Sequence, residues 1–201
     1  TLVKSSAASD VYKRQVRYLA SSTLNANGPH VSDPRSGEII ESDINWYHNV
    51  MKLLRNWYFV QASAVDPEAR GVEFRNEVMG ELIRFVSSHE FGHTIGLPHN
   101  MGSSSAYPVD SLRSATFTKK YGTSPSIMDY ARFNYVAQPE DSVKNFYPRV
   151  GTYDIWSVKW GYTYFSDEDK NSEKKILNDW IKNNANNYDY WFGYSNGIDP
   201  R

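Results

Sequence analysis

The segment His89–Asn100 reads HEFGHTIGLPHN, and its residues follow the pattern H-E-x-x-H-x-x-G-x-x-H. The residues before it, from Glu73 onward, have apolar side chains at nearly helical spacing and include no proline, which predicts one helix that ends near Ile95. Side chains four residues apart lie one above the other on a helix. His89 and His93 are therefore placed to bind one metal ion from the same face.

Gly96 marks the expected end of this helix, because glycine tolerates a positive φ and lets the chain turn so that His99 returns as a third ligand. Three imidazoles leave one coordination position for water, as in catalytic zinc sites. Structural zinc sites have a fourth protein ligand, commonly cysteine, and the sequence contains no cysteine. Glu90 is expected to take a proton from water rather than to bind the metal. The alternative is a helix whose histidines only cap or pack.

A second motif, SIMDY at residues 126–130, follows the histidine pattern. It resembles the Met-turn of the metzincins, a family of zinc peptidases in which this methionine lies beneath the zinc ligands. Tyr130 matches a tyrosine that astacin-like and serralysin-like metzincins place near the metal, where it stabilises the oxyanion. A buried aromatic residue that only packs under the site is the alternative interpretation of Tyr130.

The resemblance extends to five stretches, residues 28–44, 90–104, 106–114, 125–141 and 153–162. Together they look like the zinc-dependent metalloprotease domain of large bacterial, Bacteroidetes-type proteins, the Met-zincin or EcxA-like zinc-binding family. This resemblance covers most of residues 16–201 and implies a secreted or cell-envelope zinc endopeptidase that belongs to a larger parent chain with additional domains. Asn100 stands where astacins have glutamate, so no role transfers to it from that family.

The resemblance also implies an α+β fold with a twisted mixed β-sheet, the zinc-binding helix and a helical C-terminal lobe, truncated at both ends. The upper lobe is expected at about 16–99 and the lower lobe at about 100–201. The pattern of the sequence predicts a strand at Val16–Ala20, a hairpin or bulged pair of Pro29–Asp33 with Gly37–Ser42, and a helix from Asp43, as N-cap, to Tyr58. Residues 101–127 are expected to be mostly loop, with one helical turn near Asp110–Phe117, and helices are predicted at Tyr153–Tyr162 and Glu173–Asn184. The aromatic tail 183–196 is expected only to pack.

By the same resemblance, a polypeptide substrate would bind along the edge strand Gly28–Asp33 through main-chain hydrogen bonds. Residues Ala131–Tyr135 would form the wall of the pocket for the side chain that follows the cut. His30 and His48 lie outside the histidine pattern, and we expect an ordinary edge-strand residue and a helix-surface residue, respectively.

The composition excludes several other classes of protein. The net charge is −1, without a basic patch interleaved with aromatic residues, so nucleic acid is not an expected partner. No apolar run is long enough to span a bilayer. The absence of cysteine excludes disulfides and thiol catalysis.

The N-terminal residues 5–15 read SSAASDVYKRQ, which is the translation of a transposase-based sequencing adapter. We therefore treat Thr1–Gln15 as an artefact and leave it out of the prediction of the fold. The alternative is a genuine polar leader.

The interpretation of the whole sequence is a zinc-dependent endopeptidase with His89, His93 and His99 as metal ligands and with Glu90 and Tyr130 in catalysis. Two alternatives stay open. A non-catalytic zinc-binding interaction module would need the histidines but not Glu90, so the presence of Glu90 argues against it. A zinc hydrolase of non-peptide amides would use the same site residues.

Overall fold

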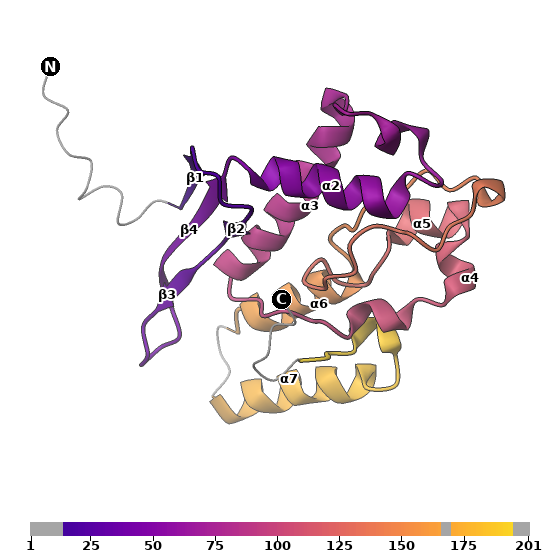
Figure 1. Ribbon diagram of the computed structural model, residues 1–201. Helices are drawn as coiled ribbons and strands as arrows, with labels where there is room; N and C mark the ends of the chain where they lie inside the picture. Colours follow the sequence, from indigo (N-terminus) through magenta and orange to yellow (C-terminus); the bar gives the residue numbers. More distant parts are fainter. Residues whose placement is uncertain (1–13, 166–169, 195–201) are drawn as a thin grey trace, which may run out of the picture. The chain divides into compact units, whose positions relative to one another are not determined.

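The computed structural model describes residues 14–165 and 170–194 (Figure 1). The chain forms two compact units, one of Thr1–Val60 with Glu68–Pro98 and the other of Gln61–Pro67 with His99–Arg201. The first contains the strands and the helix with two of the histidines, and the second contains short and long helices joined by loops. The predicted α+β class, with a mixed sheet and a helical C-terminal part, is confirmed.

The sheet is organised around its longest strand, β4 (Ile39–Tyr47). Strand β1 (Gln15–Leu19) runs parallel to β4, whereas β2 (Ala26–Asn27) and β3 (His30–Ser32) run antiparallel to it. A bulge interrupts the pairing between Val31 and Ser32, as expected for the predicted hairpin. The predicted first strand is also confirmed, and it begins at Gln15.

Most of the segment interpreted as a sequencing adapter, residues 1–13, lies outside the described residues. The structure does describe its last two residues. Arg14 donates hydrogen bonds to the carbonyl oxygens of Ile39 and Ile40 at 2.7 and 3.1 Å, respectively, and Gln15 pairs with Asp43 in the sheet.

The predicted helix from Asp43 is wrong over its first residues. Residues 43–47 are the end of β4, and the helix α2 spans Val50–Ala62. Asp43 does not cap a helix, because its carboxylate accepts a hydrogen bond from the Gln15 backbone N–H at 3.0 Å and pairs with Arg17. The side chains of Ile44 and Trp46 are buried on either side of Asn45, and this alternation is that of a strand.

Two long helices complete the first unit. Helix α2 is followed by a 3₁₀ turn, η1 (Pro67–Arg70), and α3 spans Asn76–Thr94. Helix α3 contacts β4 and β2. It starts at Asn76 rather than at Glu73. In the segment before it, the carbonyl oxygens of Gly71 and Val72 accept hydrogen bonds from Arg55. The core consists of Ala26, Ile44, Trp46, Val50, Leu54, Tyr58, Val78, Leu82, Phe85 and Val86.

The second unit is more helical near its start than predicted. The single expected turn is in fact two helices, α4 (Val109–Leu112) and α5 (Ala115–Tyr121). The Ser114 hydroxyl caps α5 by accepting a hydrogen bond from the Phe117 N–H at 3.3 Å. The two later predicted helices are confirmed as α6 (Thr152–Tyr162) and α7 (Lys170–Asn184). Short 3₁₀ turns are η2 (Ser103–Ala106), η3 (Pro139–Asp141) and η4 (Tyr188–Tyr190).

Across the described part of the chain, no helix combines the length and the apolar composition that crossing a lipid bilayer requires.

Candidate metal centre

Helix α3 places two of the predicted site residues, His89 and His93, on one face. Their ring centroids lie 4.8 Å apart, with the ring planes at 86° to each other. His89 is buried and His93 is half-buried. The helical spacing of four residues therefore brings the two imidazoles together, as the sequence predicts.

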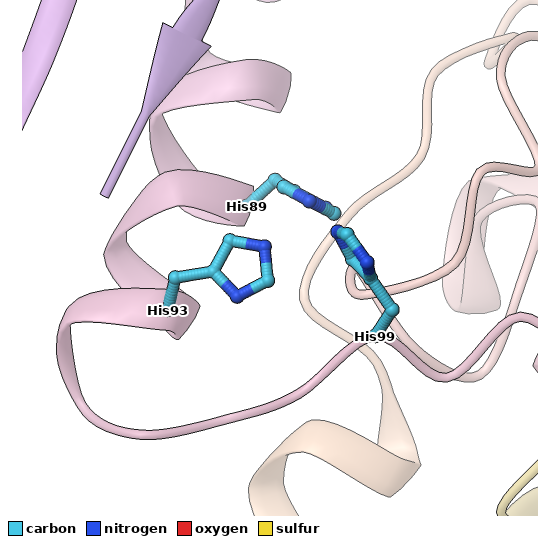
Figure 2. A group of neighbouring side chains, drawn as sticks. All are labelled: His89, His93 and His99. Atoms are coloured by element: carbon cyan, nitrogen blue, oxygen red, sulfur yellow. The ribbon is translucent and has the colours of Figure 1, made fainter. Parts of the chain in front are cut away.

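The third histidine returns because the helix ends at a glycine turn. Gly96 has φ +87°, a conformation that glycine adopts without a steric penalty. The Leu97 N–H then donates to the Gly92 carbonyl at 3.0 Å and closes the end of α3. Figure 2 shows the imidazole of His99, from the loop after this turn, facing those of His89 and His93. The predicted φ at Gly96 is confirmed.

The three histidines form a group that suits a metal ion. Each offers one ring nitrogen, and these nitrogens lie within 4.8 Å of one another. Zinc binds imidazole nitrogens at about 2.0–2.1 Å, and in a tetrahedral arrangement any two of them are about 3.4 Å apart. Small side-chain rotations would bring all three nitrogens to one ion, so the donor set fits zinc.

The backbone fixes the proton of one imidazole in this group. His93 Nδ1 lies 2.9 Å from the carbonyl oxygen of Leu97. A carbonyl oxygen only accepts hydrogen bonds, so Nδ1 carries the proton and Nε2 carries the lone pair that a metal requires. Burial also lowers the pKa of His93, which favours the neutral imidazole that binds metals.

Glu90 follows His89 on α3 and is buried. Burial raises the pKa of its carboxyl group to about 7, and a hydrogen bond from the Gly28 backbone opposes this rise. Gly28 lies in close contact with the helix, since a Cβ atom built at this residue would lie 2.3 Å from the Glu90 carbonyl oxygen. The connection between β2 and β3 thus approaches α3 at Glu90 through a residue without a side chain.

In the second unit, the SIMDY segment is buried and tightly bonded. Met128 is fully buried, with 0% of its surface exposed. Its carbonyl oxygen accepts a hydrogen bond from the Asn100 N–H at 3.0 Å. The turn is thereby joined to the residue that directly follows His99.

Tyr130 lies against the third histidine. Its ring centroid is 4.7 Å from that of His99, at an interplanar angle of 63°. The guanidinium carbon of Arg132 lies 4.7 Å from the centroid of the same ring, and Arg132 has φ 58°, which is uncommon for a residue with a side chain. The tyrosine ring thus contacts the third histidine on one hand and, on the other, a residue that directly follows the SIMDY motif.

The two other histidines differ in outcome. His30 is exposed in β3, as predicted. His48 lies in the turn before α2 and not on the helix surface, because β4 extends to Tyr47. Its Nδ1 shares a hydrogen bond with the Tyr18 hydroxyl, and the two rings are in edge contact at 5.9 Å.

The sequence did not predict the contacts of three residues near the site: Gly28, Asn100 and Asp154. Each acts through partners far away in the chain, and for Asp154 these are the Ser126 hydroxyl and the Ile127 N–H. For Asp154, the local signal was an aspartate at the start of a predicted helix. It equally fits an ordinary helix N-terminus, where acidic residues are common.

Three features together define a metzincin-type metal site. They are two histidines on one helix, a third histidine after a glycine turn, and a buried turn that contains a methionine. A family model described as Met-zincin matches residues 71–201. The chain belongs to the Met-zincin family. Neither a curated protein nor a solved structure matches it.

Proposed function

We propose that this chain is a zinc-dependent endopeptidase in which His89, His93 and His99 bind the metal and Glu90 is the general base. The observation that carries the proposal is the convergence of the three imidazoles, with their nitrogens within 4.8 Å of one another, beside a buried glutamate on the same helix. A protein that only bound zinc would need the histidines but would have no use for a buried carboxylate next to them.

Each residue has a chemical role in this proposal. Zinc would supply Lewis acidity, which polarises the scissile carbonyl and lowers the pKa of water. Glu90 accepts the proton of the attacking water and passes it to the leaving amine. Tyr130 donates a hydrogen bond to the oxyanion as it develops. The hydrogen bond from Gly28 orients the Glu90 carboxylate.

The substrate in this proposal is a polypeptide in extended conformation that lies along residues 28–33. Strand β3, which is part of this segment, is exposed throughout. Among the described residues, β3 pairs with β4 alone, so its other edge presents main-chain groups to which a peptide can add as a further strand. Such binding is largely independent of sequence, because main-chain hydrogen bonds provide the affinity.

The test is incubation of the purified protein with a peptide library, with and without a chelator, followed by mass spectrometry of the products. We expect internal cuts that the chelator abolishes and added zinc restores. Zinc binding without any cut would favour a non-catalytic zinc-binding module. Turnover of non-peptide amides without turnover of peptides would favour the hydrolase alternative.

A secreted or cell-envelope location within a longer chain is part of the same proposal. It rests on the resemblance to large bacterial, Bacteroidetes-type proteins that the sequence analysis describes. Fractionation of the native cells with an antibody against residues 71–201 tests it, and a signal confined to the cytoplasmic fraction would contradict it.

A further inference from the structure

Asn100 connects three segments of the second unit. It is fully buried, with 0% of its surface exposed. Its backbone N–H donates to the Met128 carbonyl at 3.0 Å, and its carbonyl accepts from the Ser103 N–H at 3.1 Å. Its side-chain amide donates to the Trp191 carbonyl at 2.9 Å and accepts from the Gly193 N–H at 2.8 Å. The residue that directly follows His99 is therefore bonded both to the SIMDY turn and to a segment near the C-terminus.

The two side-chain bonds require an amide. Trp191 is extended, with φ −73° and ψ 140°. The Asn100 side-chain amide is hydrogen-bonded to both the Trp191 carbonyl and the Gly193 N–H. Only an amide offers a donor and an acceptor side by side, since a carboxylate would only accept and an apolar side chain would do neither. Asparagine, rather than the glutamate of astacins, is thus the residue that fits this contact.

The backbones of the two segments also approach each other closely. A Cβ atom built at Gly193 would lie 2.7 Å from the Gly102 Cα atom and 2.9 Å from its nitrogen, and one built at Gly102 would lie 3.0 Å from the Gly193 Cα atom. A side chain at either position would push the segments apart. The residue between Trp191 and Gly193, Phe192, stacks on Tyr153 of α6 with ring centroids 6.1 Å apart and an interplanar angle of 12°.

We propose that residues 191–193 are a supporting part of the metal centre, and that Asn100 is the positioning residue through which they set the affinity for zinc. This inference rests on the proposed role of His99 as a metal ligand. His89 and His93 are held by a long helix, whereas His99 lies on a loop without regular hydrogen bonding. The bonds of Asn100 hold that loop. Residues that orient a metal ligand affect metal affinity by about 10–100-fold when they are changed.

The test is the zinc dissociation constant of the full chain, measured by competition with a chromophoric chelator. We expect Asn100→Asp to weaken zinc binding by about 10–100-fold, because the carboxylate repels the Trp191 carbonyl. Gly193→Ala disturbs the same contact without altering Asn100, and it is expected to weaken zinc binding by about 10-fold. This second variant keeps the test valid if Asn100→Asp does not fold.

Asn134 provides the matched control. It is also a buried asparagine of the second unit, and its amide donates to the Leu112 carbonyl at 2.7 Å and accepts from the N–H groups of Val136 and Ala137 at 3.3 Å. Asn134→Asp should lower the thermal stability of the metal-free protein as Asn100→Asp does, while its zinc affinity stays within about 3-fold of the parent.

Equal zinc affinities in the parent, Asn100→Asp and Gly193→Ala would overturn the inference, and so would an equal loss in the Asn134→Asp control. If the parent chain bound no zinc, the proposed metal site itself would be wrong. The experiment distinguishes this outcome from the one in which the parent binds zinc and the variants bind it equally well, which would contradict the role of Asn100 alone.

Discussion

The Ser126 hydroxyl donates a 2.6 Å hydrogen bond to the carboxylate of Asp154, and this pair connects the SIMDY turn to the start of α6. The same carboxylate accepts the N–H groups of Ile127 at 2.7 Å and Gly151 at 2.8 Å. Ser126 in turn accepts the Met128 N–H at 3.0 Å. A single buried aspartate, 3% exposed, therefore holds the backbone that leads into the methionine and the backbone at the start of α6.

Replacing Asp154 with asparagine should destabilise the protein by about 1–3 kcal/mol. The amide keeps one oxygen for the N–H groups of Ile127 and Gly151, but its nitrogen takes the place of the oxygen that accepts the Ser126 proton. One buried polar group is left without its partner. Denaturant unfolding measures the change.

The control for this variant is Asp110→Asn, at an exposed position in α4, which should change the stability by less than about 0.5 kcal/mol. Equal stabilities of the Asp154 variant and the parent would show that the carboxylate does not hold the turn.

The parts of the fold that the sequence predicted are those with local causes. The helix with His89 and His93, its end at Gly96 and the hairpin of β3 with β4 each follow from spacing or turn residues within a short segment. The error at Asp43–Tyr47 has a non-local cause, because that segment becomes a strand by pairing with β1. Gln15 of β1, which is hydrogen-bonded to Asp43, lies 28 residues earlier in the chain. Aromatic residues that fit a helical pattern also fit a strand buried on one face.

In the candidate site too, the features with local causes were predicted and those with distant partners were not. The histidine spacing predicts which residues converge, since it is a property of one helix and one turn. The roles of Asn100 and Asp154 depend on partners in distant segments, such as Trp191, which is 91 residues from Asn100. No local feature of the sequence indicates such pairs.

Glu90→Gln should retain zinc and lose hydrolysis. The amide has the shape of the carboxylate but cannot accept a proton, so we expect the rate to fall by about 10²–10⁴-fold. Elemental analysis of the purified variant measures the zinc, and a peptide assay measures the rate. Glu77→Gln, at an exposed position in the first turn of the same helix, is the control and should retain full activity. Near-normal turnover by the Glu90 variant would require a different base.

Tyr130→Phe should lower kcat with little change in KM. The hydroxyl is expected to contact the substrate mainly in the transition state, and loss of one oxyanion donor costs on the order of 10²-fold in kcat. Phenylalanine retains the ring that lies against His99 and Arg132, so the packing is preserved. Tyr164→Phe, at a position that is 85% exposed, should leave kcat unchanged. An unaltered kcat in the Tyr130 variant would assign this residue to packing alone.

Zinc should also stabilise the folded protein. A ligand that binds only the native state at 1,000 times its dissociation constant adds about 4 kcal/mol to the free energy of unfolding. Thermal unfolding with excess zinc, compared with unfolding in a chelator, measures this effect. Replacing His99 with alanine should remove most of the stabilisation, whereas replacing the exposed His48 should not. Identical unfolding of the parent with and without zinc would contradict a native-state metal site.

Gly28→Ala should impair catalysis while zinc binding persists, because the new methyl group would lie 2.3 Å from the Glu90 carbonyl oxygen. The connection between β2 and β3 must then move away from α3, and the hydrogen bond from the Gly28 backbone to the Glu90 carboxylate is lost. Overpacking of this kind lowers the free energy of unfolding by about 1–3 kcal/mol, which denaturant unfolding measures. In a peptide assay, kcat should fall more than KM rises. The matched control is Gly80→Ala in α3, the helix that contains Glu90. A Cβ atom at Gly80 meets nothing within 4 Å, so this variant should raise the stability by up to about 1 kcal/mol. If Gly28→Ala kept both the stability and the kcat of the parent, the close approach of Gly28 to Glu90 would have no part in the reaction.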